Sequence, residues 1–309
     1  MATQPLPTLQ TPRRPRFLMR WYYWLLLVMA AGYGLAFAMH WDDRGVLWVR
    51  ERLETPAERQ QSVWLPDYRA VIDAKLLPGM EKDEASDLSY DPQTKTLFSV
   101  MGKNPFLVEL SLQGDVLRKM PLVGWTNPEG VATMGNGLIA ITDEREHMLS
   151  IVKVDADTRE LHRDNFPKYD LGPSKDQNKA FEAIVWDPRN QQLLLGEERP
   201  PALFSWKSDG SQTLKGDKQK LVSNELDIRN LSALAIDPRT GHTLVLSADS
   251  HLLLELDEKG EQVSFMTLLG GFNGLKKTIP RAEGVTMDDA GTLYMVSEPN
   301  LFYRFEKQK

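Results

Sequence analysis

The sequence contains no cysteine, which excludes disulfide bonds, thiolate metal sites and a cysteine nucleophile. Histidine is scarce, with five copies in 309 residues, so zinc and copper are less suitable metals than an ion that prefers oxygen ligands. No Gly-x-Ser-x-Gly elbow, phosphate-binding loop or dinucleotide fingerprint occurs in the chain. The sequence therefore carries none of these signatures of catalysis or nucleotide binding.

Acidic residues are missing from the first 20 positions, which hold four of the 37 basic side chains. All 43 acidic residues follow, so the rest of the chain has a clear negative balance. Nucleic-acid binding requires a basic face that displaces counterions from the phosphates. We therefore expect no nucleic-acid partner.

One long apolar run stands out, because the 19 residues from Trp21 to Met39 carry no charge. This length is close to what a helix needs to cross a bilayer. Arginines precede the run and Asp42 follows it, so the positive-inside bias places the N-terminus in the cytoplasm. We predict a single-pass anchor over residues 17–40 in a bacterial inner (plasma) membrane. The alternative is a cleaved signal peptide, since Ala36-Phe37-Ala38 resembles a cleavage site, and both interpretations export the domain to the periplasm.

The segments around the anchor have simple interpretations. Residues 1–16, rich in proline and threonine, are expected to form a disordered cytoplasmic tail. Residues 41–67 contain a short amphipathic stretch with Leu47, Trp48 and Leu53, which could form one helix at the outer membrane face; we prefer to interpret the segment as a linker. The globular domain is assigned to residues 68–307.

A strand–turn–strand unit recurs five times in this domain, at intervals of 43, 53, 50 and 51 residues. The first strands of the five units are Ser86–Tyr90, Glu129–Thr133, Glu182–Trp186, Ser232–Ile236 and Glu283–Met287. An Asp-Pro or Asp-Asp turn follows in four units, and second and third apolar strands come next. Short strands repeating at this period are typical of β-propeller blades. We therefore predict an all-β fold, a β-propeller preceded by one transmembrane helix.

The number of blades depends on an alternating strand, Tyr68–Leu77, which precedes the first unit. The last unit ends after its third strand, and a closed ring leaves no exposed sheet edge. The early strand is therefore expected to complete the last blade, which gives five blades of four strands. A sixth blade, placed in the connections 155–178 and 211–228, is the alternative.

Acidic residues recur at two corresponding positions of the units. In a propeller the start of the innermost strand and the end of the second strand open on the same face. The strand starts are Ser86, Glu129, Glu182, Ser232 and Glu283, and the strand ends are Gly102, Asp143, Glu198, Asp249 and Glu298. Seven of these ten positions are carboxylates, so the sequence predicts an acidic mouth at one end of the central channel.

Carboxylates that converge in a partly enclosed place must either take up protons or bind a cation. Ca²⁺ takes six to eight oxygen ligands, which the seven acidic residues and the nearby Asn127, Asn230 and Asn300 could supply. Acids at strand ends also cap turns or pair with basic residues, and Lys103, Arg145 and Arg199 are adjacent in sequence. A bound Ca²⁺ and a set of structural ion pairs are therefore both open interpretations.

Two histidines, His147 and His251, fall between the second and third strands, on the same face as the acidic residues. An imidazole beside a metal-bound water could act as a general base. A solvated loop histidine is the commoner case, and it is the interpretation that we prefer.

Six segments, which lie in this order within residues 68–306, are typical of a known family: Tyr68–Asp73, Phe181–Ala183, Ser223–Leu226, Ala282–Asp288, Val296–Asn300 and Phe302–Phe305. They resemble the SdiA-regulated, YjiK-like family of membrane-anchored β-propeller proteins. The resemblance implies an exported propeller distantly akin to NHL repeats, without an established reaction. The family is also distantly similar to calcium-dependent propeller lactonases and esterases, where acidic and amide residues at the channel mouth hold the ion. Glu129, Glu182 and Glu283 occupy the comparable strand starts.

Three functions follow as hypotheses. The first is a membrane-tethered module without enzymatic activity that binds Ca²⁺, a small molecule or a protein at the acidic mouth. The second is a Ca²⁺-dependent hydrolase of esters or lactones, assisted by His147 or His251. The third is a purely structural propeller, in which basic side chains neutralise every acid of the mouth. Fold alone does not choose among them.

Overall fold

The computed structural model describes residues 16–38, 41–172, 181–221, 226 and 228–308. The chain divides into two compact units, Met1–Arg44 and Gly45–Lys309. The first contains helix α1 (Arg16–Ala38), whose window Trp21–Ala38 is long and apolar enough to span a membrane. Most of the expected disordered tail lies outside the described residues, and so do the last two positions of the predicted anchor.

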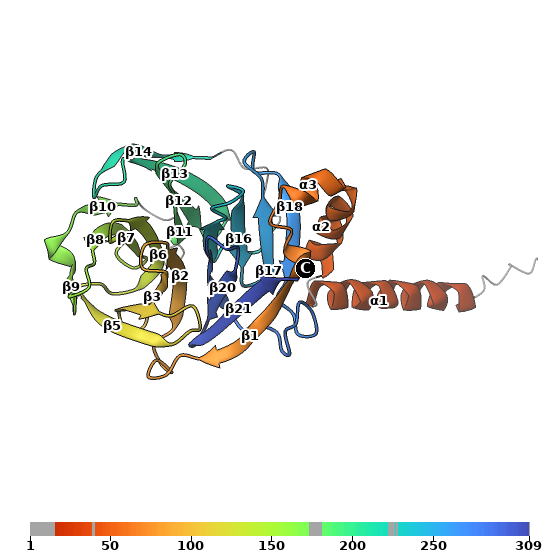
Figure 1. Ribbon diagram of the computed structural model, residues 1–309. Coiled ribbons are helices and arrows are strands. Elements are labelled where there is room, and N and C mark those ends of the chain that lie inside the picture. Colours follow the sequence, from red (N-terminus) through yellow and green to blue (C-terminus); the bar gives the residue numbers. More distant parts are fainter. Residues whose placement is uncertain (1–15, 39–40, 173–180, 222–225, 227, 309) are drawn as a thin grey trace, which may run out of the picture. The chain divides into compact units, whose positions relative to one another are not determined.

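The second unit is a five-bladed β-propeller, with five sheets arranged around a common centre (Figure 1). Blades 1 and 2, from the centre outward, consist of β2 (Ala85–Asp91), β3 (Thr96–Met101), β4 (Phe106–Leu110) and β5 (Val116–Val123), then β6 (Pro128–Gly135), β7 (Leu138–Asp143), β8 (Met148–Lys153) and β10 (Lys168–Asp170). Blade 3 consists of β11 (Phe181–Asp187), β12 (Gln192–Glu197), β13 (Ala202–Ser208) and β14 (Leu214–Lys220). Blades 4 and 5 consist of β15 (Ala233–Ile236), β16 (Thr243–Ser247), β17 (Leu252–Leu256) and β18 (Gln262–Thr267), then β19 (Ala282–Met287), β20 (Leu293–Ser297), β21 (Leu301–Lys307) and β1 (Tyr68–Leu76).

The ring closes as predicted. Strand β1, which precedes the first unit in sequence, pairs antiparallel with β21 and completes the last blade. The connections proposed to hide a sixth blade contain other elements. One contains η2 (Arg163–Asn165), the outer strand β10 of blade 2 and the short β9 (Leu161–His162), which pairs in parallel with β5. The other supplies β14 of blade 3, so the prediction of five blades is confirmed.

The hydrophobic core consists of five clusters, one between each pair of neighbouring blades. The middle strands face a cluster on both sides, and every residue of β17 and β20 is buried. The outer strand β14 is largely exposed. Burial of both faces explains why the middle strands read as continuous apolar runs and not as alternating patterns.

The aspartate after four of the inner strands closes a turn. A side-chain oxygen of Asp91, Asp187, Asp237 and Asp288 accepts the backbone N–H of the residue two positions later, at 2.8 to 3.1 Å. Aspartate is favoured in turns because its short carboxylate can replace a backbone acceptor in this way. The repeated Asp-Pro and Asp-Asp pairs therefore mark the ends of the inner strands.

The segment interpreted as a linker is structured and contributes to the domain, which corrects that interpretation. It forms α2 (Trp41–Leu53), α3 (Pro56–Gln60) and η1 (Leu65–Asp67). Val63 and Leu65 are fully buried in the cluster between blades 4 and 5. The buried carboxylate of Glu255 on β17 accepts the backbone N–H groups of Val63 and Trp64, at 2.7 and 3.0 Å. Apolar burial and these hydrogen bonds fix the segment against blade 4.

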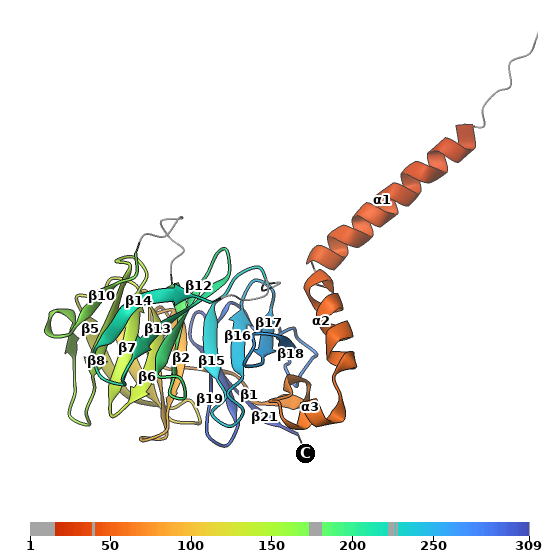
Figure 2. The same ribbon diagram turned by 90° about the horizontal axis from the view of Figure 1, so that it is seen from above.

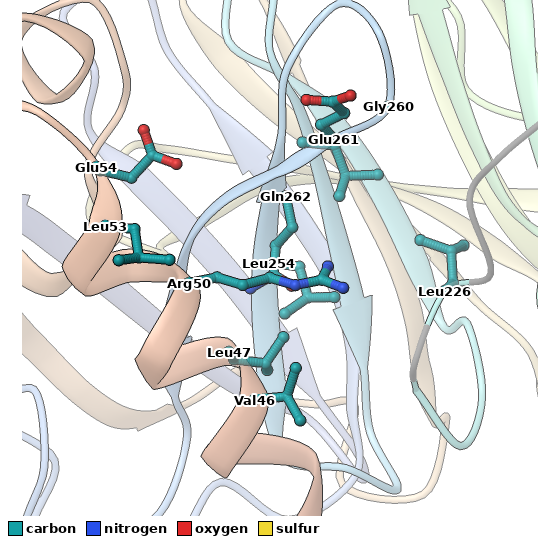
Figure 3. A pocket seen from close by; sticks show the side chains of 11 residues that line it. Val46, Leu47, Arg50, Leu53, Glu54, Leu226, Leu254, Gly260, Glu261 and Gln262 are labelled. Atoms are coloured by element: carbon teal, nitrogen blue, oxygen red, sulfur yellow. The ribbon is translucent and has the colours of Figure 1, made fainter.

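The part of α2 that belongs to the second unit lies beside β17 and β18, as Figures 1 and 2 show. Leu47 is buried in the cluster between blades 3 and 4. A cavity of about 410 Å³ separates the helix from the blade, and Arg50 of the helix and Leu254 of β17 line it (Figure 3). Glu51 accepts the N–H of Phe265 at 3.3 Å, and burial raises the pKa of Glu51 to about 7.

Candidate functional site: the acidic mouth of the channel

The residues at the starts of the inner strands occupy irregular positions. The pairing of inner and second strands shifts register in four blades, at the points where Ser86, Glu129, Glu182 and Glu283 lie. Such bulges redirect a side chain and are frequent next to binding sites. In blade 4, Ser232 lies directly before β15. A repeated backbone feature, and not only a repeated residue type, therefore marks this end of the channel.

The inner strands approach one another closely just beyond this position. A Cβ atom on Gly130 would lie 2.6 Å from the carbonyl oxygen of Glu182, and one on Gly284 would lie 2.7 Å from the carbonyl carbon of Asp87. Only a residue without a side chain fits so close to a neighbouring backbone. The glycines that follow Glu129 and Glu283 therefore bring the glutamates of different blades together.

The two serines of this column interact with glutamates of the next blade. Ser86 lies close enough to Glu129, and Ser232 close enough to Glu283, for each serine to act against the burial that raises the pKa of that glutamate. The serines are therefore part of the mouth, as partners of the acids that follow them around the ring.

A small polar notch adjoins Glu129 at Gly102. A Cβ atom built on this glycine would lie 2.9 Å from Ser86 Oγ, 3.2 Å from Glu129 Oε1 and 3.3 Å from Asn127 Oδ1. Three oxygen atoms from two blades thus lie within 3.3 Å of one point, which leaves too little room for a methyl group unless one of them shifts. Oxygen atoms gathered in this way suit a hydrogen-bond donor or a hard cation.

A single arginine compensates the charge in blade 5. Arg281 donates to Glu283 Oε1 at 3.0 Å and to Glu298 Oε2 at 2.8 Å. Burial raises the pKa of Glu283 to about 7, although Arg281 acts in the opposite direction. Burial also raises the pKa of Glu298.

Glu129 and Glu182 have no ion pair with any residue that the structure describes. Burial raises the pKa of Glu129 to about 8, and the nearby Glu283 contributes. Burial and the neighbouring carboxylates, including Glu198, raise the pKa of Glu182 to about 10. A group with a pKa this high holds its proton at neutral pH unless a positive charge arrives. The third hypothesis, complete neutralisation by basic side chains, is not met within the described residues.

Asp87 is a further acid that the sequence argument did not select. Its position holds glycine or alanine in the other four units: Gly130, Ala183, Ala233 and Gly284. The carboxylate accepts the N–H of Leu88 at 2.7 Å and that of Val131, in the next blade, at 2.9 Å. Burial raises the pKa of Asp87 well above its usual range, and Glu129 and Glu283 add to the rise. A comparison of the five units at this position would have revealed it.

One acid of the second column is held in a turn by backbone N–H groups. Asp143 ends β7 with its carboxylate buried, and it accepts the N–H of Thr126 at 2.7 Å and that of Glu146 at 3.2 Å. The next residue, Glu144, contributes to the raised pKa values of Glu129 and Glu182 and so lies near them.

Blades 3 and 4 share an ion-pair group. Glu198 and Asp249 both pair with Arg199, at 3.2 Å in the case of Glu198. Asn230 donates from Nδ2 to Glu198 at 3.4 Å, and its Oδ1 accepts from Ser247 at 2.9 Å. Asn300 donates to the carbonyl of Leu77 at 2.7 Å. Asn127, one of the three predicted amide ligands, directs an oxygen to the notch at Gly102.

The two candidate histidines occupy the same turn position in different blades. His147 and His251 have φ angles of 51° and 47°, a region that histidine enters more readily than most residues. Their carbonyls accept the N–H groups of Leu171 and Leu268, both at 2.9 Å, which bind the turn to the following segment. These contacts give both residues a structural role, and the catalytic role remains a prediction.

Among the residues that the structure describes, no three histidine, aspartate or glutamate side chains are placed to hold one metal ion. The acids are distributed around the mouth. The metal-binding role of Glu129, Glu182, Glu283, Asp143, Glu198, Asp249 and Glu298 therefore remains a prediction.

The fold defines the class of protein, a five-bladed β-propeller, and the starts of its inner strands bring several glutamates near one another. The chain belongs to the SdiA-regulated family, whose family model matches residues 60–306. The family expected from the sequence is thereby confirmed.

Solved structures with a similar fold include enzymes. Myxococcus xanthus glutaminyl cyclase is 14% identical, with 78% of this chain and 97% of that chain covered and a TM-score of 0.53. A streptogramin B lyase is 11% identical, with coverages of 78% and 98% and a TM-score of 0.46. A chain of a nidogen/laminin complex is 17% identical, with coverages of 69% and 72% and a TM-score of 0.47. At these identities the likeness concerns the fold alone.

Proposed function

We propose that this protein is a membrane-anchored binding module whose propeller takes up a positively charged ligand at the acidic mouth. The observation that carries the proposal is the pair Glu129 and Glu182. Both carboxyls have strongly raised pKa values, and no described basic side chain pairs with either. A cation that enters the mouth would supply the missing charge and displace their protons.

The residues and backbone around Glu129 favour a binding site over acids that are buried without a function. Ser86 and Asn127 direct oxygen atoms to the notch beside Glu129. Backbone bulges at the same position of four blades orient the strand-start side chains, and such positioning costs regular pairing. A backbone irregularity that recurs at the same position of several blades is typical of a functional site.

Two kinds of cation fit the mouth in different ways. Ca²⁺ favours the carboxylate, amide and hydroxyl oxygens present, but the described acids do not surround one point. An organic amine needs no such shell, because its N–H groups reach separate acceptors. We therefore place an organic amine first and keep Ca²⁺ as the second candidate.

The location follows the sequence prediction. The helix that could span a membrane precedes the propeller, and the arginines lie on its N-terminal side. By the positive-inside rule the propeller is then extracytoplasmic, in the periplasm of a bacterial cell. The mouth would meet ligands outside the inner membrane.

Calorimetric titration of the full-length protein in lipid nanodiscs tests the proposal, with putrescine and CaCl₂ as separate probes. Titrations at pH 7 in two buffers of different ionisation enthalpy measure proton release. We expect saturable binding of one probe, with protons released as Glu129 or Glu182 ionises.

The variant Glu182→Gln should weaken binding at least tenfold and reduce the proton release. The matched control is Glu258→Gln, because Glu258 is 74% exposed and lies in the turn between β17 and β18 of blade 4. If neither probe gives saturable heat, or if both variants behave alike, the proposal is wrong.

A further inference from the structure

The inner strands have a second common feature at their other ends. The fifth residues of the five segments, Tyr90, Thr133, Trp186, Ile236 and Met287, line one pocket together. Four steps along a strand separate each of them from the acidic position, a distance of about 13 Å. The pocket is therefore the opposite opening of the same channel, and every blade contributes to it.

This pocket differs from the acidic mouth in chemistry. Its volume is about 310 Å³, and Trp186, Met134, Ile236 and Met287 supply apolar surface. Prolines of three Asp-Pro turns add to the rim: Pro92, Pro188 and Pro238. Sites for small molecules are typically concave and mostly apolar, with volumes that begin near this size. Methionine side chains adapt to the shape of flat ligands.

The polar groups of the pocket already have partners. Thr133 Oγ1 donates to the carbonyl of Tyr90 at 2.6 Å, and Thr286 Oγ1 accepts the N–H of Tyr90 at 3.0 Å. The hydroxyl of Tyr90 donates to Asp289 at 3.3 Å. The guanidinium of Arg189 donates to three backbone carbonyls, those of Pro238, Arg239 and Thr240. A charged ligand would have to compete with these contacts, whereas an apolar one would not.

We propose that this opening is a second binding site, which takes an uncharged, flat, apolar small molecule against Trp186. The proposal is independent of the cation site, because it rests on other residues at the other end of the channel. A ring compound of suitable size would contact the indole of Trp186 and the thioethers of Met134 and Met287.

Indole is a suitable probe, and indole-3-acetate is its anionic counterpart. Each is titrated calorimetrically into the full-length protein in nanodiscs, with empty nanodiscs as the blank. We expect one indole to bind per chain, and indole-3-acetate to bind at least tenfold more weakly.

Two variants test the location. Trp186→Ala removes the aromatic wall, and Ile236→Trp fills the pocket from its rim, so each should weaken indole binding about tenfold or more. Phe272→Ala is the matched control, because Phe272 is an aromatic residue that is 55% exposed and does not line the pocket. Thermal unfolding shows which variants remain folded. If Trp186→Ala does not fold, Ile236→Trp tests the location of the site.

Three results would overturn this assignment. They are the absence of saturable indole binding, an equal effect of Phe272→Ala, and binding of indole-3-acetate as tight as that of indole. Loss of putrescine binding would not affect it, so the two proposals fail separately.

Discussion

The substitution Glu182→Gln should stabilise the ligand-free protein at neutral pH. Burial and nearby carboxylates raise the pKa of Glu182 to about 10, against 4.5 in an unfolded chain. The folded state therefore keeps a proton that the unfolded state loses above pH 4.5. Because the folded state binds more protons in this range, its stability falls as the pH rises. Glutamine resembles the protonated carboxyl but cannot ionise in either state.

The size of the effect follows from the two pKa values. At pH 7 the unfolded glutamate has passed its own pKa by about 2.5 units, and each unit corresponds to about 1.4 kcal/mol. The variant should then be more stable than the wild type by at most about 3.5 kcal/mol. For a domain of this size the melting temperature rises by at most roughly 7–14 °C. At pH 4 the two proteins should melt together, because both states are protonated.

The assay is thermal unfolding of the full-length protein between pH 4 and pH 8.5, without divalent ions or amines. Glu258→Gln is again the exposed control and should follow the wild type at every pH. Parallel pH profiles for Glu182→Gln and the wild type would refute the reasoning. A destabilised variant at pH 7 would show that the carboxylate is ionised and paired in the folded protein.

Three further predictions concern the fold and its orientation. Gly284→Ala should lower the free energy of unfolding in urea by about 1–3 kcal/mol, because its Cβ would lie 2.7 Å from the backbone of Asp87. The control Gly79→Ala, with open space around it, tests the positive φ of 74° alone. Equal losses of stability in the two variants would contradict the close packing of blades 5 and 1. The hydrogen bond from His242 to Glu255 raises the pKa of His242. The stabilisation from this contact is therefore present below pH 6.5 and is lost as the pH rises through the pKa of His242 in the folded protein. His242→Gln should flatten the fall in stability between pH 6 and 8, and an unchanged slope of stability against pH would contradict this. Since the chain has no cysteine, a single Gln308→Cys should react with a membrane-impermeant maleimide in spheroplasts, whereas Thr8→Cys should not, and the reverse pattern would refute the proposed orientation.

The architecture could be predicted because its information is local. Four of the five inner strands end in an aspartate that accepts a hydrogen bond two residues later, as at Asp187 and Asp237, so these units mark their own turns. The five units then define a ring, and the strand before Ser86 could pair only with the free edge of the last blade. The segment 63–65 was missed because three apolar residues, without a repeat around them, do not reveal which blade they contact.

The composition of the site was less accessible. Asp143 and Glu144 are adjacent, yet one caps a turn with a buried carboxylate and the other lies near the mouth glutamates. Because successive side chains of a strand face opposite sides, an error of one residue exchanges these roles. Arg281 was missed for a related reason, since its approach to Glu283 and Glu298 depends on two strands meeting.

The sequence by itself determined the anchor-length apolar run, the five copies of the strand unit and the recurrence of acids at the strand starts, because each of these is written in neighbouring residues. Tertiary structure alone decided which carboxyls are buried together, which of them an arginine compensates, and that the opposite opening is apolar. These properties depend on distances between blades, and the dielectric surroundings that raise the pKa values of Glu129 and Glu182 exist only once the ring has closed.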